Sequence, residues 1–244
     1  THAKLTVNLD FTPSQINVVL DSQNLALHAA LARQSQPLAI CTPTGRRGWT
    51  FTQKEPLTAV SGHLRIKENS KFNVDAAHTS DAPDAKAQQI DFTHTTSANL
   101  DWTLGYMRHK TNWFWSCINS YLPDGRHFTL NLSMGVNETG ASENACWLDG
   151  QIVYLPPVMF IRQDLDTPAQ NMWRIYHQNL GWSKVDINLT FTPITVYKKT
   201  DNFGVLASIF EQWLGLYSGE IRLGDEVIKI DKVMGLAEDH FATW

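Results

Sequence analysis

The sequence predicts an all-β protein made of antiparallel barrels, arranged as a duplicated pair in which the first barrel is incomplete. Three observations lead to this class: apolar and polar residues alternate with a period of two, turns containing Gly and Asp separate the alternating segments, and two short phrases occur twice. Period-two alternation is typical of strands with one buried face. Many short strands joined by regular turns indicate a sandwich or a barrel.

The alternation is clearest in three segments. Residues 4–12, 127–134 and 184–192 alternate apolar with polar side chains, so each is predicted to be a strand with one face toward water. The first and third segments run into Pro13 and Pro193. We expect both strands to end there, because proline cannot donate a hydrogen bond within a central ladder.

Turn residues join neighbouring strands into hairpins. Asp124-Gly125, Asp149-Gly150 and Gly224-Asp225 each follow one apolar-rich segment and precede another. Gly and Asp tolerate the positive φ that tight hairpin turns require, so all three predict antiparallel pairs. Two further apolar segments, residues 24–33 and 203–214, are compatible with either a short helix or a strand.

Two phrases recur in the same order along the chain. Residues 7–13 (VNLDFTP) are echoed by residues 187–193 (INLTFTP), and residues 61–66 (SGHLRI) by residues 218–223 (SGEIRL). Phrases that recur in order indicate an internal duplication.

The duplication predicts two units. We expect residues 1–111 to form a partial N-terminal unit that lacks its early strands, and residues 112–244 to form a C-terminal barrel. The first phrase has only six residues before it, so we also expect the chain to be part of a longer protein. The alternative is that residues 1–111 form only a partial sheet packed on the second unit.

Composition excludes several classes of partner. The formal net charge is −4 and 43% of the 244 residues are hydrophobic, which supports a large core and gives no basis for binding nucleic acid or an anionic membrane. No apolar run is long enough to span a bilayer. The three cysteines form no CxxC pattern, so we expect buried thiols, a reducing compartment and a cytoplasmic location.

Cofactor motifs are not found in the sequence. The nine histidines are dispersed, without His-x-His or His-Glu-x-x-His spacing, so no metal site is expected. Neither a GxxxxGK phosphate loop nor a GxSxG nucleophile elbow occurs. We therefore predict no metal and no cofactor.

Ionisable residues cluster near the C-terminus. Glu238, Asp239 and His240 are consecutive; on a strand Glu238 and His240 share one face and Asp239 takes the other. A carboxylate beside an imidazole suits general acid–base chemistry, and it equally suits hydrogen bonding to backbone where a barrel closes. Asp101 and Glu143 are further catalytic candidates, and Glu143 could instead close a loop.

Aromatic and amide side chains are candidates for ligand binding. Trp113, Phe114 and Trp115 place large rings on both faces of one strand, although a barrel interior needs only one face. The second set of rings either fills an interface or lines an apolar pocket. The candidate ligand-binding residues are Trp102, Trp113, Trp115, Asn131, Asn144, Trp147 and Trp244.

Several motifs resemble a known family. The chain from Asp101 onward contains DW-x-x-G (101–105), TNW-x-W (111–115), DGR (124–126), LNL (130–132), ENA-x-W-x-DG (143–150), FTP (191–193) and GLAEDH (235–240). Together they resemble the bacterial domain of unknown function 2804. That family is distantly similar to proteins with two lipocalin-like, or calycin-like, barrels, which include carotenoid hydratase, tocopherol cyclase and fungal Diels–Alderases. The resemblance implies lipocalin-like barrels and a hydrophobic, isoprenoid or polyketide-like ligand.

Three functions remain open from the sequence. The first is binding of a hydrophobic small molecule in a barrel or inter-barrel cavity. The second is a hydratase, cyclase or isomerase in which carboxylate and His groups place a proton on an alkene and aromatic rings stabilise the cation. The third is a structural or interaction protein whose barrel is filled by side chains.

Overall fold

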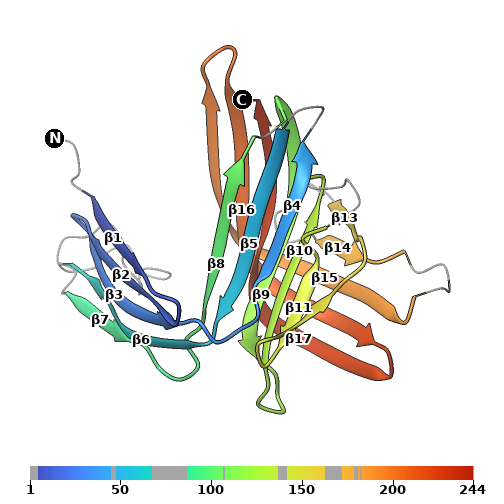
Figure 1. Cartoon of the computed structure of the whole chain (residues 1–244), viewed down its shortest axis with the longest axis horizontal. Helices are drawn as coiled ribbons and strands as arrows, with labels where there is room; N and C mark the ends of the chain where they lie inside the picture. Colours follow the sequence, from blue (N-terminus) through green and yellow to red (C-terminus); the bar gives the residue numbers. More distant parts are fainter. Residues whose placement is uncertain are drawn as a thin grey trace, which may run out of the picture. The chain divides into compact units, whose positions relative to one another are not determined.

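The computed structural model describes residues 5–44, 48–67, 87–106, 108–136, 142–162, 172–178, 181 and 183–243. Within these residues the chain forms strands and turns and no helix (Figure 1). The segments that the sequence left undecided are therefore extended: residues 25–32 form a strand, and residues 207–214 begin a long one. Because every strand pair whose register is defined is antiparallel, the predicted fold class is confirmed.

The chain divides into two compact units. Unit 1 comprises Thr1–Ser35 and Pro56–Asn99, and unit 2 comprises Gln36–Glu55 and Leu100–Trp244. The predicted division into residues 1–111 and 112–244 stays a prediction.

Unit 1 contains an open five-stranded sheet with the order β1-β2-β3-β6-β7. Its strands are β1 (Thr6–Phe11), β2 (Gln15–Asp21), β3 (Leu25–Ala32), β6 (Ala59–Ile66) and β7 (Gln88–Asp91). All six side chains of β1 are exposed, including Leu9 and Phe11. An alternating sequence is thus present in a strand of which neither face is covered within the described residues.

Unit 2 contains two sheets. The first has three strands in the order β4 (Leu38–Thr44), β5 (Gly48–Leu57) and β8 (Ala98–Gly105). The second has nine strands in the order β12-β11-β10-β9-β17-β16-β15-β14-β13. The strands of this sheet are β9 (Lys110–Tyr121), β10 (His127–Met134), β11 (Ala145–Leu148), β12 (Gln151–Tyr154), β13 (Met159–Arg162), β14 (Trp173–Tyr176), β15 (Val185–Asn202), β16 (Ala207–Leu223) and β17 (Glu226–Thr243).

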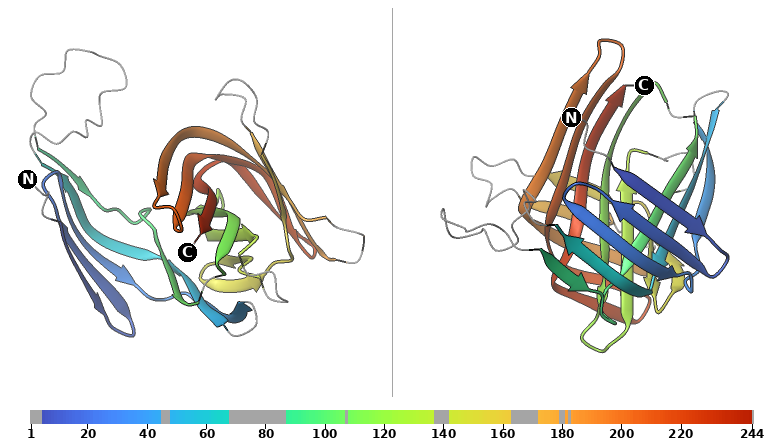
Figure 2. Two further views of the ribbon diagram at one scale, coloured as in Figure 1. Left: turned by 90° about the horizontal axis from the view of Figure 1, so that it is seen from above. Right: turned by 90° about the vertical axis from the view of Figure 1, so that its left-hand side faces the viewer.

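The nine-stranded sheet curls strongly (Figure 2). Its two edge strands, β12 and β13, follow each other in sequence and are joined by residues 155–158. Such a link spans at most about 3.5 Å per residue, so the two edges must come close together. The concave face is filled by a core that includes Ile118, Leu130, Phe191 and Tyr217, each 0% exposed.

Two expectations about strands are wrong. The strand predicted to end at Pro193 continues as β15 to Asn202, with a register shift between Pro193 and Thr195 against β16. A shift of this kind gives proline a place where the regular ladder is interrupted. Residues 127–134 do not leave a polar face in water: Thr129, Asn131 and the other polar side chains of β10 are buried.

The recurring SG phrase marks one local geometry. Gly62 has φ 122° and Gly219 has φ 137°, and a Cβ on either would lie about 2 Å from a carbonyl oxygen of the neighbouring strand (2.0 Å from His28 O and 2.1 Å from Asn188 O). Only glycine fits such a contact at positive φ. The strand beside Gly219 in unit 2 is β15, which contains the other recurring phrase, INLTFTP. The strand beside Gly62 in unit 1 is β3, which does not contain the matching phrase VNLDFTP.

A buried hydroxyl chain crosses the core of the nine-stranded sheet. Ser116 Oγ donates to Tyr217 Oη at 2.8 Å, and Tyr217 Oη donates to the carbonyl of Leu236 at 2.7 Å.

Tyr217→Phe should lower the free energy of unfolding by about 1–3 kcal/mol, because Ser116 loses its acceptor in a dry core. Urea unfolding measures this loss. Tyr154→Phe, at a 62% exposed position, is the matched control and should change stability by less than about 0.5 kcal/mol; equal losses in the two variants would contradict the interpretation.

Candidate functional site

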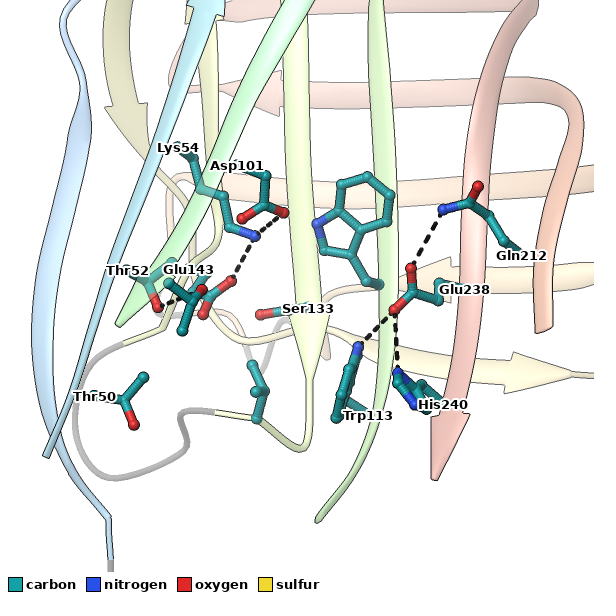
Figure 3. A pocket seen from close by; sticks show the side chains of 13 residues that line it. Thr50, Thr52, Lys54, Asp101, Trp113, Ser133, Glu143, Gln212, Glu238 and His240 are labelled. Atoms are coloured by element: carbon teal, nitrogen blue, oxygen red, sulfur yellow. Dashed lines mark hydrogen bonds and ion pairs between the residues drawn. The ribbon is translucent and has the colours of Figure 1, made fainter. Parts of the chain in front are cut away.

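The two sheets of unit 2 enclose a cavity of about 540 Å³ (Figure 3). It lies on the face of the nine-stranded sheet opposite the packed core. The cavity is lined by Thr50, Thr52, Lys54, Asp101, Thr103, Trp113, Trp115, Ser133, Val136, Glu143, Gln212, Glu238 and His240.

Strand β5 supplies one wall of the cavity. Its alternation places Thr50, Thr52 and Lys54 toward the cavity, where all three are buried, and Trp49 and Phe51 on the opposite face. Successive side chains of a strand point to opposite faces. The polar face of β5 therefore points to the interior of unit 2. Its aromatic face points the other way, with Trp49 exposed, which is the reverse of a usual core strand.

Strand β8 repeats this arrangement. Asp101 and Thr103 line the cavity, whereas Trp102 is 46% exposed and packs edge-on against Phe51, with the ring centroids 5.3 Å apart. Trp102, a predicted ligand-binding residue, therefore lies on the outer face of the three-stranded sheet.

The nine-stranded sheet contributes aromatic and ionisable groups from β9 and β17. The register pairs Glu238 with Trp115 and His240 with Trp113, so all four side chains fall on one face. Between the two tryptophans, Phe114 points the other way and packs against rings of the core. Rings on both faces of this strand are thus explained: one set fills the core and the other lines a cavity.

An ion-pair cluster centred on the buried Lys54 lies where β5, β8 and the segment before β11 meet. Lys54 Nζ is 2.5 Å from Asp101 Oδ2 and 3.2 Å from Glu143 Oε2, and the Lys54 side chain is only 10% exposed. Burial opposes the charge of Lys54, but the two carboxylates outweigh it and raise the pKa above its ordinary value. The ammonium also lies 5.6 Å from the ring centroid of Trp115.

Glu238 is the carboxyl group on the opposite side of the cavity. Its Oε1 accepts a hydrogen bond from Trp113 Nε1 at 2.8 Å, and Gln212 Nε2 lies 3.5 Å from Oε2. Burial raises the pKa of Glu238; hydrogen bonds from Trp113 and Gln212 oppose this rise without cancelling it. Glu238 therefore holds a proton more readily than an exposed glutamate does.

His240 lies beside Glu238 but is not hydrogen-bonded to it. The distance from Nδ1 to Glu238 Oε1 is 4.0 Å, while Nε2 lies 2.9 Å from Ser208 Oγ. The imidazole also packs against Trp113 and Phe210. Burial lowers its pKa, so the neutral ring is favoured near pH 7.

Asp239 points away from the cavity. Its Oδ2 accepts from Arg162 Nη1 at 2.9 Å, and the same nitrogen donates to Glu211 Oε2 at 2.7 Å. Of the five predicted catalytic residues, the cavity brings together Glu238, His240, Asp101 and Glu143 and leaves out Asp239.

Three of the predicted ligand-binding residues have structural contacts instead. Asn131, which is buried, accepts from Trp115 Nε1 and donates to the carbonyl of Glu143, which holds two lining residues in place. Asn144 accepts from the backbone of Ser133. Trp147 is 1% exposed and donates to the carbonyl of Gln36. Trp244 lies outside the described residues.

Lys54 is the main lining residue that the sequence did not single out. Its signal was present: residues 49–54 alternate aromatic or amide with Thr, Thr and Lys, a pattern that predicts a strand with a polar face. That the polar face is the buried one depends on the second sheet, which covers it. The sequence did not single out Gln212 either, because residues 203–214 were compatible with a helix as well as a strand and so its face was not defined.

The arrangement can bind and polarise an organic molecule. Two indoles give apolar contact area, Glu238 can donate a proton, and the Lys54 cluster fixes charge on the facing wall. Among the described residues no group of three His, Cys, Asp or Glu side chains is placed to hold a metal ion. In the same part of the chain no helix is long and apolar enough to cross a membrane.

Fold and site together define an all-β, lipocalin-like protein with a polar and aromatic cavity. A family model described as "Domain of unknown function (DUF2804)" matches residues 2–244, and the chain belongs to that family. Among solved structures the chain is similar to the crystal structure of CghA with Sch210972, with a TM-score of 0.54 and 11% identity over 98% of this chain and 68% of that one. A search of curated proteins finds no match.

Removing the Lys54 charge should destabilise the protein strongly. Lys54→Met leaves the Glu143 carboxylate, 5% exposed, without its cation, so we expect a loss of about 3–5 kcal/mol in the free energy of unfolding. Lys198→Met, which removes a half-exposed lysine paired with Glu211, should cost less than about 1 kcal/mol.

A double variant separates charge from packing. In Lys54→Met with Glu143→Gln, the buried negative charge is gone as well, and denaturant unfolding should show part of the stability restored. If the double variant is no more stable than Lys54→Met alone, the loss comes from packing and not from an unpaired charge.

Proposed function

We propose that this protein binds a small molecule with an apolar body and at least one polar group in the cavity of unit 2. The observation that carries the proposal is the 540 Å³ cavity, in which the indoles of Trp113 and Trp115 lie beside buried ionisable side chains. In a protein with only a structural role, partly buried ionisable groups beside an open cavity would add desolvation cost without any gain in packing.

The size and chemistry of the cavity support this proposal. Small-molecule sites commonly measure about 300–1,000 Å³ and combine apolar walls with a few convergent polar groups. Here the polar groups are held by neighbours: Trp113 orients Glu238, and Asn131 holds Trp115. Preorganised polar groups fix the orientation of a ligand at low entropic cost.

The third function, a barrel filled by side chains, accounts for the packed face of the nine-stranded sheet but not for the cavity on the opposite face. Rings such as Trp173, Phe191 and Tyr217 fill the concave face. A filled core and an open cavity therefore coexist in unit 2. The structure of CghA, recorded with Sch210972, lends support at the level of the fold.

Ligand binding should change tryptophan fluorescence. Titration with farnesol, retinol or decanol should quench the emission saturably, because Trp113 and Trp115 line the cavity. Trp113→Phe and Trp115→Phe should each remove a large part of the quench. The control Trp102→Phe, on the outer face of β8, should leave it intact. A quench that survives in both cavity variants and disappears in the control would place the ligand elsewhere, and no saturable response to any probe would contradict the proposed function.

We propose acid-catalysed chemistry on an alkene as the second candidate function. The observation that favours it is Glu238, a largely buried carboxyl whose raised pKa favours the protonated form, with Trp113 in contact and Trp115 on the same cavity wall. The carboxyl proton would pass to one alkene carbon, and the π electrons would form the new C–H bond. The adjacent carbon becomes a cation, which indole rings stabilise. Water then adds its oxygen and returns a proton to Glu238, or a neighbouring C–H proton passes to the Glu238 carboxylate while its bonding electrons form the new double bond of an isomer.

Solvent deuterium tests this chemistry directly. Farnesol incubated with the protein in D₂O should acquire carbon-bound deuterium, detected by mass spectrometry. Glu238→Gln, which keeps an acceptor for the Trp113 N–H but cannot donate an acidic proton, should reduce incorporation by about 100-fold or more. Asp239→Asn, on the opposite face of β17, should retain it. Equal incorporation with and without protein would remove this second function and leave the binding function standing.

A further inference from the structure

The cavity carries more negative than positive charge. Among the described residues that line it, Asp101, Glu143 and Glu238 are acidic, Lys54 is the ammonium and His240 the imidazole. With the imidazole neutral, the two ion-pair partners Asp101 and Glu143 already outnumber the Lys54 cation, and Glu238 adds a third carboxyl group. This excess constrains which polar group a ligand can bring into the cavity.

Lys54 already forms ion pairs with two carboxylates of the protein. Its ammonium contacts Asp101 at 2.5 Å and Glu143 at 3.2 Å, and both contacts would weaken if Lys54 turned toward a bound anion. Removing a buried ion from its partners is strongly unfavourable. A ligand carboxylate would therefore meet the negative charge of the cavity without gaining Lys54 as a counter-ion.

Glu238 is the acidic group whose charge is least compensated. Its ion-pair contact in the described part of the chain is His240 Nδ1, at 4.0 Å, and a neutral imidazole supplies no full charge. Burial is the main effect that disfavours the Glu238 carboxylate, while the attraction of Lys54 outweighs the repulsion of Asp101 without cancelling the effect of burial. A cation entering beside Glu238 would favour its carboxylate form.

The indoles are arranged for contact with a cation. The Lys54 ammonium already lies 5.6 Å from the centroid of Trp115, within the range of a cation–π interaction. Trp113 lies on the same face and touches Glu238 through its N–H group. Aromatic faces attract ammonium groups of ligands, and here a carboxyl group that could pair with such a cation lies beside them.

We infer that the ligand carries a positively charged nitrogen on an apolar body, with the nitrogen beside Glu238 and the apolar part against Trp113 and Trp115. The inference rests on the proposed binding function and names the chemical class of its ligand.

Three probes with the same chain and different head groups test the inference. Decylamine, decanol and decanoate are titrated into the intact protein below their micelle-forming concentrations, with binding followed by calorimetry and tryptophan fluorescence. We expect decylamine to bind about tenfold or more tightly than decanol, and decanoate to bind most weakly. Glu238→Gln should weaken decylamine binding by about tenfold and leave decanol nearly unchanged.

A matched variant removes the effect of net charge. Asp239→Asn changes the charge of the protein by the same amount, one residue along β17, on the face away from the cavity, and should keep the preference for decylamine. If decanoate binds as tightly as decylamine, or if Glu238→Gln and Asp239→Asn weaken decylamine equally, the inference is overturned while the binding function stands. If none of the three probes binds, the inference and the binding function both fail.

Discussion

A buried ammonium group is tolerated only where carboxylates accompany it, and this requirement ties together three segments that are far apart in sequence. Lys54 comes from β5, Asp101 from β8 and Glu143 from the segment before β11. Lys54 and Asp101 lie on neighbouring strands of the three-stranded sheet, whereas Glu143 precedes β11 of the nine-stranded sheet. The complete cluster therefore forms only when the three-stranded sheet covers the nine-stranded one, and its charged side chains line the cavity between the two sheets.

Burial on both faces distinguishes β10, which lies two strands in from the β12 edge of the nine-stranded sheet. One face of β10 contributes Leu130 and Leu132 to the packed core, and the other contributes Asn131 and Ser133 to the layer beneath the three-stranded sheet. Buried polar groups are costly unless they are hydrogen-bonded. Asn131 meets this condition with two hydrogen bonds, to Trp115 and to the carbonyl of Glu143, and so supports two residues that line the cavity.

The function proposed for the cavity follows from the division between the two faces of one sheet. The concave face is filled by rings and aliphatic side chains, which makes it a stabilising core. On the opposite face, Glu238, Trp113 and Trp115 remain next to open space. Stability and the proposed ligand binding thus fall on different faces of the same strands, and the pairing of β9 with β17 decides which residues lie on each face.

The sequence alone determined the all-β class and the sharing of faces within a strand. Alternation placed Glu238 and His240 together and Asp239 apart, and the structure bears this out. A period of two specifies faces because successive side chains of a strand point in opposite directions. It also explains why Trp113 and Trp115 lie on one face while Phe114 joins the core on the other.

Only the tertiary structure decided which of the two faces is covered, and by what. The polar face of β10 was expected in water and is buried, and the role of Lys54 depends on Asp101 and Glu143, which only the fold places beside it. Pairing with β16 likewise carried β15 past Pro193, and the segment around Gln212 became a strand because β17 and β15 flank it. Alternation reports on neighbours along the chain, whereas burial, charge pairing and cavity formation depend on segments that meet only after folding.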